Sequence, residues 1–294
     1  MNEKTVSRRH IIALVILYVL GNGIIIFPLN GTDEFGFTAY LVSLLLLIGF
    51  YSLFNVITSK ISKTHKAVFC GYILLISVVS LFIGASAFKD IVNFVSQTML
   101  QRVPTFFISL IFGITVVYFA LKPFDSIFKF SLVNCVFVVV IILFFFIAPM
   151  EKYELRNIYI FRAPNLNSLL PQVKVYLLNP VLHSLSLPLF LNLCFGKTCG
   201  KPAIVGVFFG GVFLGLCLLA PILLFGAHTG GEFGFPFSSA AETVTVGRLF
   251  TRLDGFVSFV YFITCLVKIT VCLKVSLVSL KRVKEGFRNN RFGA

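Results

Sequence analysis

About eight apolar runs, each long enough to cross a lipid bilayer, dominate the sequence of this 294-residue chain. A spanning helix needs about 20 mostly apolar residues, and its backbone polar groups must pair within the segment. A membrane β-barrel would instead alternate apolar and polar residues. We therefore predict an all-α integral membrane protein with one membrane domain, residues 1–294. The expected spans are residues 10–29, 36–57, 67–88, 104–121, 129–149, 176–195, 202–226 and 255–278.

Composition and charge placement support the membrane assignment. The chain is 58% hydrophobic and only 12% charged, which is too apolar for a soluble domain of this size. The net charge of +14 does not indicate nucleic-acid binding, because Lys and Arg lie in short gaps between apolar runs and form no continuous polar face. With the N-terminus inside, inner segments hold sixteen Lys and Arg residues and outer segments hold eight. The positive-inside rule therefore predicts that both termini are cytoplasmic.

Motifs for enzymatic chemistry are absent from the sequence. It contains no nucleophile motif, phosphate-binding loop, paired carboxylates or metal-ligand spacing. Seven cysteines are present without a C-x-x-C pair, and six of them fall inside apolar runs, which is typical of buried, reduced side chains. We expect no enzyme activity, no cofactor and no metal site.

The first span is interrupted in its second half by Gly21-Asn22-Gly23, and Pro28 follows. Glycine weakens a helix and proline removes a backbone donor. One interpretation is an unwound segment, which lipid tolerates only where the freed backbone groups line a cavity or bind a ligand. The other interpretation is a kinked but continuous helix with glycine at a packing contact. This segment alone favours the second.

The sixth span is interrupted as well, and this favours the first interpretation. Transporters built from inverted repeats pair one broken helix in each half, with the substrate bound at the breaks. Because a half-helix N-terminus favours a carboxylate, we expect an amino acid or similar small zwitterion as ligand. A hydrogen-bonded interior histidine is the alternative role for His183. The interrupting residues are Asn179, Pro180, His183, Ser184, Ser186, Pro188 and Asn192.

Lys268 lies within the last span, on a helical stripe with Ser258, Tyr261, Cys265 and Cys272. A lysine at bilayer depth costs about 3 kcal/mol. We expect this stripe to face the bundle interior or a wet cavity. Lys268 then serves as a fixed charge in the place of a coupling cation or as a proton carrier, unless its side chain snorkels to the inner interface.

Small residues recur at helical spacing in two other spans. Gly206, Gly210, Gly211 and Gly215 form such a stripe in the seventh span, and the third span has Ser77, Ser80 and Gly84 on one face. Such stripes allow helices to approach closely, so we predict packing contacts there. Trp is absent, and Tyr40 and Tyr153 near span ends are the predicted interfacial aromatic residues.

The chain resembles the spore germination permease family, the B subunits of nutrient germinant receptors, within the amino acid–polyamine–organocation transporter superfamily. The resemblance covers essentially the whole chain. Its most specific element is similar to the family's Arg-x-Asp element, and Lys268 falls where the following helix commonly has a lysine. The stretches that carry it are Leu20-Gly21-Asn22-Gly23-Ile24 with Pro28, Phe225-Gly226 leading to Phe235-Pro236, and residues 246–256 with Arg252 and Asp254.

The resemblance implies an inverted-repeat bundle of ten helices in the spore inner membrane. It implies an amino acid or similar nutrient as ligand, and the receptor A and C subunits as partners. Gly21, Asn22, Gly23, His183, Ser184 and Lys268 are the expected ligand-binding residues. Pro28 and Pro188 shape the breaks. Arg252 and Asp254 are expected to pair and fix the outer end of the last span, although a surface ion pair contributes under about 1 kcal/mol.

This sequence departs from the family in its number of spans. The family has ten, whereas this chain has about eight, and the last two are expected to be absent after Lys281. Three functions stay open: a germinant-sensing receptor subunit, a secondary amino acid transporter, and a truncated scaffold subunit that no longer binds ligand. The two breaks favour the first two functions equally, the Arg-x-Asp element favours the first, and the missing spans favour the third.

Overall fold

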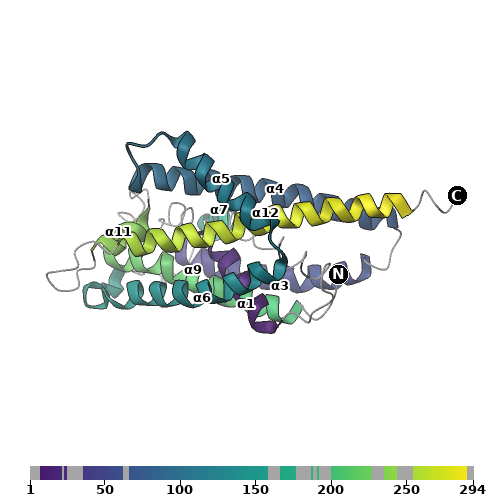
Figure 1. Cartoon of the computed structure of the whole chain (residues 1–294). Helices are drawn as coiled ribbons and strands as arrows, with labels where there is room; N and C mark the ends of the chain where they lie inside the picture. The colour runs from purple at the N-terminus through teal and green to yellow at the C-terminus, as the bar shows by residue number, and fades with distance from the viewer. Residues whose placement is uncertain are drawn as a thin grey trace.

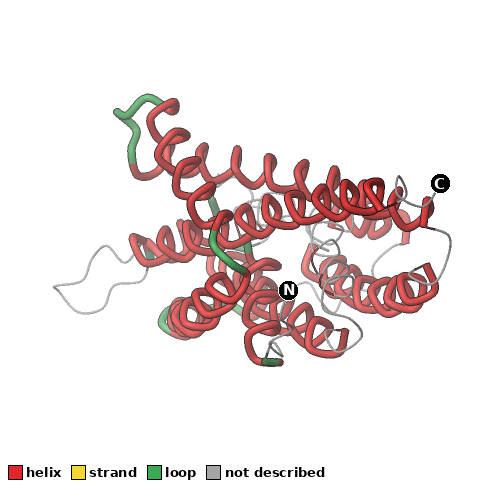
Figure 2. Tube along the Cα trace, turned by 45° about the vertical axis from the view of Figure 1, so that its right-hand side comes forward, coloured by secondary structure: helices red, strands yellow, loops and turns green. Residues whose placement is uncertain are grey.

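The computed structural model is a bundle of helices (Figures 1 and 2). It contains no strand among the residues it describes, so the predicted all-α fold is confirmed. The described residues are 7–21, 23–24, 36–61, 66–157, 166–176, 187, 191, 200–226, 235–243 and 254–289.

The described part of the chain forms ten helical elements of more than three residues. They are α1 (Arg8–Leu20), α3 (Gly36–Ile61), α4 (Lys66–Phe94), the π-helical turn η1 (Val95–Met99), α5 (Thr105–Leu121), α6 (Phe124–Ile147), α7 (Leu166–Tyr176), α9 (Gly200–Phe225), α11 (Pro236–Glu242) and α12 (Asp254–Asn289). Two short 3-10 turns, Met150–Lys152 and Leu155–Asn157, follow α6. Within the described residues, four helical stretches are long and apolar enough to cross a membrane: Gly71–Met99, Phe124–Ile147, Gly200–Phe225 and Gly255–Lys281. Phe37–Tyr51 and Thr105–Leu121 are shorter apolar helices.

Helix α1 lies in the middle of the bundle, where it packs against α9, α6 and α12 (Figure 1). Nine of its 13 residues are buried. At 1.5 Å per residue it is about 20 Å long, which is less than the roughly 30 Å of hydrocarbon in a bilayer. By contrast, α12 has 36 residues, so it is about 54 Å long and extends beyond the apolar layer.

Small residues of α9 form a contact surface that we call the glycine seam. A Cβ added to Gly206 would lie 2.7 Å from Cβ of Val15 in α1, and one added to Gly210 would lie 2.9 Å from Cβ of Val19. Gly211 and Gly215 face Leu44 and Tyr40 of α3 in the same way. The predicted packing role of this stripe is confirmed. Tyr40 is buried with its hydroxyl donating to the Gly211 carbonyl, so its predicted interfacial position is wrong.

A second contact surface, which we call the serine seam, joins α4 to α12, and these two helices run side by side in Figure 1. The Ser276 hydroxyl donates to the Ser77 carbonyl at 2.9 Å, and the Ser77 hydroxyl donates to the Ser276 carbonyl at 3.5 Å. A Cβ on Gly84 would lie 3.0 Å from Cβ of Cys272. The face of α4 that carries small residues therefore packs on α12, as its spacing predicted.

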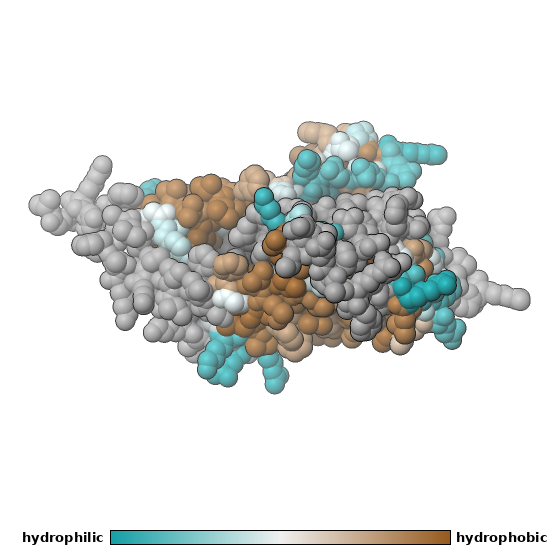
Figure 3. Space-filling model, turned by 180° about the vertical axis from the view of Figure 1, so that it is seen from behind, coloured by the Kyte–Doolittle hydropathy of each residue, from teal (hydrophilic) through white to brown (hydrophobic). Residues whose placement is uncertain are grey.

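Large apolar side chains cover the outside of the bundle. On α5, for example, Phe106 and Ile111 are each 67% exposed and Leu121 is 72% exposed. In the space-filling view, hydrophobic residues cover the middle of the described surface and hydrophilic groups lie toward its edges (Figure 3). Soluble monomers rarely expose apolar patches of this extent, whereas acyl chains solvate them. The outer surface is therefore that of a multi-pass membrane protein.

The connection after α6 is fixed to two helix ends. The Tyr153 hydroxyl donates to the Phe146 carbonyl at 2.6 Å, and the Glu154 N–H donates to the Leu223 carbonyl at 3.1 Å. Burial raises the pKa of Tyr153 to about 12, so its phenol stays neutral at physiological pH. These contacts tie the end of α6 to the end of α9.

Candidate ligand site at the break in the first helix

The first helix ends at the predicted interruption. Gly21 follows Leu20 with ψ at 133°, an extended rather than helical value. Its N–H closes the last turn on the Leu17 carbonyl at 2.9 Å, and the Gly23 N–H donates to the Gly21 carbonyl at 2.7 Å. The interpretation of this segment as a kinked but continuous helix is therefore wrong. The C-terminal end of α1 is buried in the bundle, with Leu20 0% exposed, so its carbonyls need partners within the protein.

Lys268 of α12 completes the end of α1. Its ammonium donates to the Gly21 carbonyl at 2.8 Å, across 247 residues of sequence, and the whole residue is 1% exposed. The snorkelling interpretation of Lys268 is wrong, because the side chain points into the bundle. The Gly21 carbonyl thus accepts hydrogen bonds from both Gly23 and Lys268.

The electrostatics of this contact are favourable. The carbonyl end of a helix carries a partial negative charge, which a cation stabilises. The Lys268 Nζ also lies 5.4 Å from the centroid of the Tyr18 ring, within the range of a cation–π contact. The lysine therefore places a positive charge where helix ends in other membrane proteins receive ions.

The approach of α1 to α12 requires glycine at position 21. A Cβ there would lie 2.7 Å from the Thr264 carbonyl oxygen and 2.8 Å from Cβ of Lys268. Backbone cannot yield as a flexible side chain can, so a methyl group would separate the two helices. Gly23 approaches α9 instead, where a Cβ would lie 3.2 Å from Cδ2 of Leu214.

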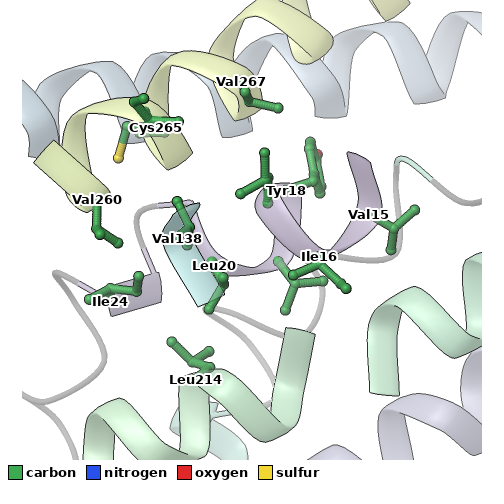
Figure 4. Packing of buried hydrophobic residues seen from close by; sticks show 14 of the residues in the cluster. Val15, Ile16, Tyr18, Leu20, Ile24, Val138, Leu214, Val260, Cys265 and Val267 are labelled. Carbon is green, nitrogen blue, oxygen red and sulfur yellow. The ribbon is translucent and has the colours of Figure 1, made fainter. Parts of the chain in front are cut away.

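Apolar and weakly polar side chains enclose the break. Figure 4 shows Tyr18 and Leu20 between α12, with Val260, Cys265 and Val267, and Leu214 of α9. The Tyr18 hydroxyl lies 3.4 Å from Sγ of Cys272. Every member of the predicted stripe, Ser258, Tyr261, Cys265, Lys268 and Cys272, is buried, so its predicted interior orientation is confirmed.

Sequence reasoning did not assign Tyr18 and Thr264 to this site. Tyr18 supplies the aromatic face beside Lys268, and the backbone of Thr264 packs on Gly21. The sequence signal for Tyr18 is its hydroxyl, which lies three positions before the Gly-Asn-Gly break. The described residues gather no group of three metal-ligating side chains.

A cavity of about 390 Å³ lies between the C-terminal end of α4, η1, α5 and Phe262 of α12. Ten of the eleven residues that line it are apolar, and the hydroxyl of the other, Thr115, donates to the Ile111 carbonyl of its own helix. Binding sites for polar ligands need a few convergent polar groups. This cavity is therefore unsuited to a zwitterion, and the break in α1 is the better candidate.

Several predicted site residues lie outside the described residues: Asn22, Pro28, His183, Ser184, Pro188 and Arg252. Their roles remain predictions. Asp254 begins α12, and in the sixth span Leu187 and Leu191 are helical and buried.

A family model described as "Spore germination protein" matches residues 5–290, nearly the whole chain. No curated protein and no solved structure matches the chain in the corresponding searches.

Proposed function

Because the chain belongs to the spore germination permease family, we propose that it is the membrane subunit of a germinant receptor that binds a small nutrient and thereby triggers germination. A germination-related, permease-like membrane protein is what the family membership and the apolar helices establish. The proposal adds the nutrient, which we take to be an amino acid. It also adds the site, which we place at the end of α1.

The observation that carries this proposal is the contact between Lys268 and Gly21. It joins a helix end inside the membrane to a buried cation, and both groups can exchange their partner for a charged ligand. A zwitterion brings an ammonium that can replace the lysine at the carbonyl and a carboxylate that the freed lysine can pair with. Binding would therefore alter the contact between α1 and α12.

The packing of the helices suggests how such a change would spread. The glycine seam ties α1 and α3 to α9, and the serine seam ties α4 to α12. Lys268 and Gly21 sit on opposite sides of the division between these two groups of helices. A ligand that prefers one relative placement of the groups shifts the population toward it. We propose that the A and C subunits of the receptor respond to that shift.

We also propose the spore inner membrane as the location, with both termini on the core side. The charge bias between the two sets of connecting segments supports this orientation.

The test is the dose response of spores that carry Gly21→Ala. Each of the twenty L-amino acids is first tested on wild-type spores, and the one with the lowest half-maximal concentration is used. We expect the substitution to raise that concentration at least about tenfold, equivalent to about 1.4 kcal/mol of lost binding. Gly71→Ala is the matched control, because a Cβ there meets nothing within 4 Å. An unchanged dose response with normal protein levels would contradict the proposal.

A secondary amino acid transporter is the second candidate, favoured by the family's permease character and by the interrupted first helix. Proteoliposomes that contain only this chain distinguish the two. Accumulation of the same labelled amino acid against its gradient would establish transport, and a receptor subunit would show none.

A further inference from the structure

Tyr261 carries a buried polar group whose purpose the fold does not explain. It lies on the Lys268 stripe of α12, seven residues nearer the start of that helix, and it is 0% exposed. Its hydroxyl has no hydrogen-bond partner among the residues that the structure describes. The next hydroxyl on this helix, that of Thr264, donates to the Val260 carbonyl at 2.8 Å. Tyr261 therefore differs from its neighbour in lacking an intrahelical acceptor.

An unbonded hydroxyl at this depth costs free energy, because neither lipid nor packed side chains replace its bonds to water. Phenylalanine would fill the same space without that cost. The ring of Tyr261 is well packed, since it meets Phe94 edge to face at 4.6 Å between centroids. Packing explains the ring, and a bound ligand would explain the hydroxyl.

Tyr261 lies one turn before Thr264, whose carbonyl packs against Gly21 at the break. Tyr261, Cys217 of α9 and Cys265 of α12 belong to the same buried cluster. Leu214, one turn before Cys217, is the residue that Gly23 packs against. Tyr261 thus lies near the break, two turns before Lys268 on α12.

We propose that the Tyr261 hydroxyl donates a hydrogen bond to the carboxylate of the nutrient bound at this break, which makes it a specificity residue of the proposed site. The proposal rests on the proposed function. The broken end of α1 offers carbonyl acceptors, which suit an ammonium group, so the carboxylate needs donors from elsewhere. Tyr261 supplies one, and a charged acceptor makes that bond stronger than a neutral pair.

The aromatic packing holds this donor in position. Phe94, the last residue of α4, also meets Phe235 edge to face at 4.9 Å. Phe235 is the N-cap of α11, so ring contacts connect Tyr261 to the segment before α12. A donor fixed in this way loses little freedom when it binds.

The experiment compares Tyr261→Phe with wild type in spores, using the most effective L-amino acid and its carboxamide as probes. In wild type we expect the carboxamide to act at least about tenfold more weakly than the acid. In Tyr261→Phe we expect the half-maximal concentration of the acid to rise about tenfold and that of the carboxamide to change less than threefold. Tyr118→Phe is the control, because Tyr118 is 56% exposed on α5. Thermal stability of the purified variant should equal or exceed that of wild type.

Two results would overturn this role. One is an unchanged response to the acid in Tyr261→Phe together with unchanged or higher stability. That result would show that the hydroxyl has no hydrogen-bond partner or bonds only to a bound water. The other is equal potency of acid and carboxamide in wild type, which needs no variant to fold. If Gly21→Ala shifts the response while Tyr261→Phe does not, this inference fails and the proposed function stands. If neither shifts it, both fail.

Discussion

The glycine seam and the serine seam join helices in different ways. At the glycine seam, small residues of α9 let α1 and α3 approach until a methyl group would collide, so the contact depends mainly on shape, with one hydrogen bond from Tyr40 to the Gly211 carbonyl. At the serine seam, two hydroxyls exchange hydrogen bonds with opposite carbonyls of α4 and α12. Steric contacts fail abruptly when a group is added. Directional contacts weaken gradually when one partner is removed.

This difference has a consequence for the candidate site. The break at Gly21 belongs to a helix of the glycine seam, and Lys268 belongs to a helix of the serine seam. The two helix groups meet there through the lysine–carbonyl bond, the contact between the Tyr18 hydroxyl and Sγ of Cys272, and apolar packing. A ligand that competes for the lysine–carbonyl bond acts at the place where the two groups can part without disrupting either seam.

The largest effect is expected from Gly210→Leu in the glycine seam. A Cβ at this position would lie 3.3 Å from the Cα of Ile16, and backbone cannot move aside. We expect the free energy of unfolding to fall by about 3 kcal/mol, the upper end of the range for an overpacked interior. Thermal unfolding of the detergent-solubilised protein measures it. Gly71→Leu, which places its side chain in open space, should leave stability within about 0.5 kcal/mol of wild type.

The all-α fold, the end of α1 at a glycine and the interior orientation of Lys268 could be predicted from the sequence. Each follows from a local property: the length of an apolar run, a Gly-Asn-Gly interruption, or a charge at bilayer depth. The extension of α12 to Asn289 could not, because hydropathy marks where a span leaves lipid and not where its helix ends.

The pairing of side chains across helices could not be predicted either. Lys268 and Gly21 are 247 residues apart, and nothing in either run specifies the other. Tyr261 appeared only as one member of a stripe, because an unbonded hydroxyl is a property of its surroundings. Tyr40 was expected near the membrane surface from its position at a span end, but Gly215 leaves room for its ring inside and the Gly211 carbonyl accepts its hydroxyl.

An intermediate effect is expected from Lys268→Met. This substitution removes the hydrogen bond from Lys268 to the Gly21 carbonyl and keeps the volume of the side chain. Loss of a buried charge should leave thermal stability equal to wild type or higher, because the lysine costs about 3 kcal/mol at bilayer depth. The half-maximal nutrient concentration for germination should nevertheless rise at least about tenfold, or about 1.4 kcal/mol. A variant that is as stable as wild type and also responds normally would show that the lysine serves neither binding nor signalling.

The smallest effect is expected from Ser276→Ala in the serine seam. It removes one interhelical hydrogen bond, that to the Ser77 carbonyl, and such bonds contribute about 0.6 kcal/mol on average within membranes. Ser109→Ala is the control, because that hydroxyl bonds only within α5, to the Thr105 carbonyl. If Ser276→Ala destabilised the protein as much as Gly210→Leu, the distinction between the two seams would be wrong.

The most direct measurement of the central claim is equilibrium binding of the most effective labelled L-amino acid to the purified chain and to its Gly21→Ala variant. Saturable binding to the wild-type chain, weakened at least about tenfold by the substitution while Gly71→Ala binds normally, is the expected result. Equal affinity of wild type and Gly21→Ala would place the nutrient elsewhere. A folded wild-type chain that binds none of the twenty amino acids would leave it a scaffold rather than a sensor.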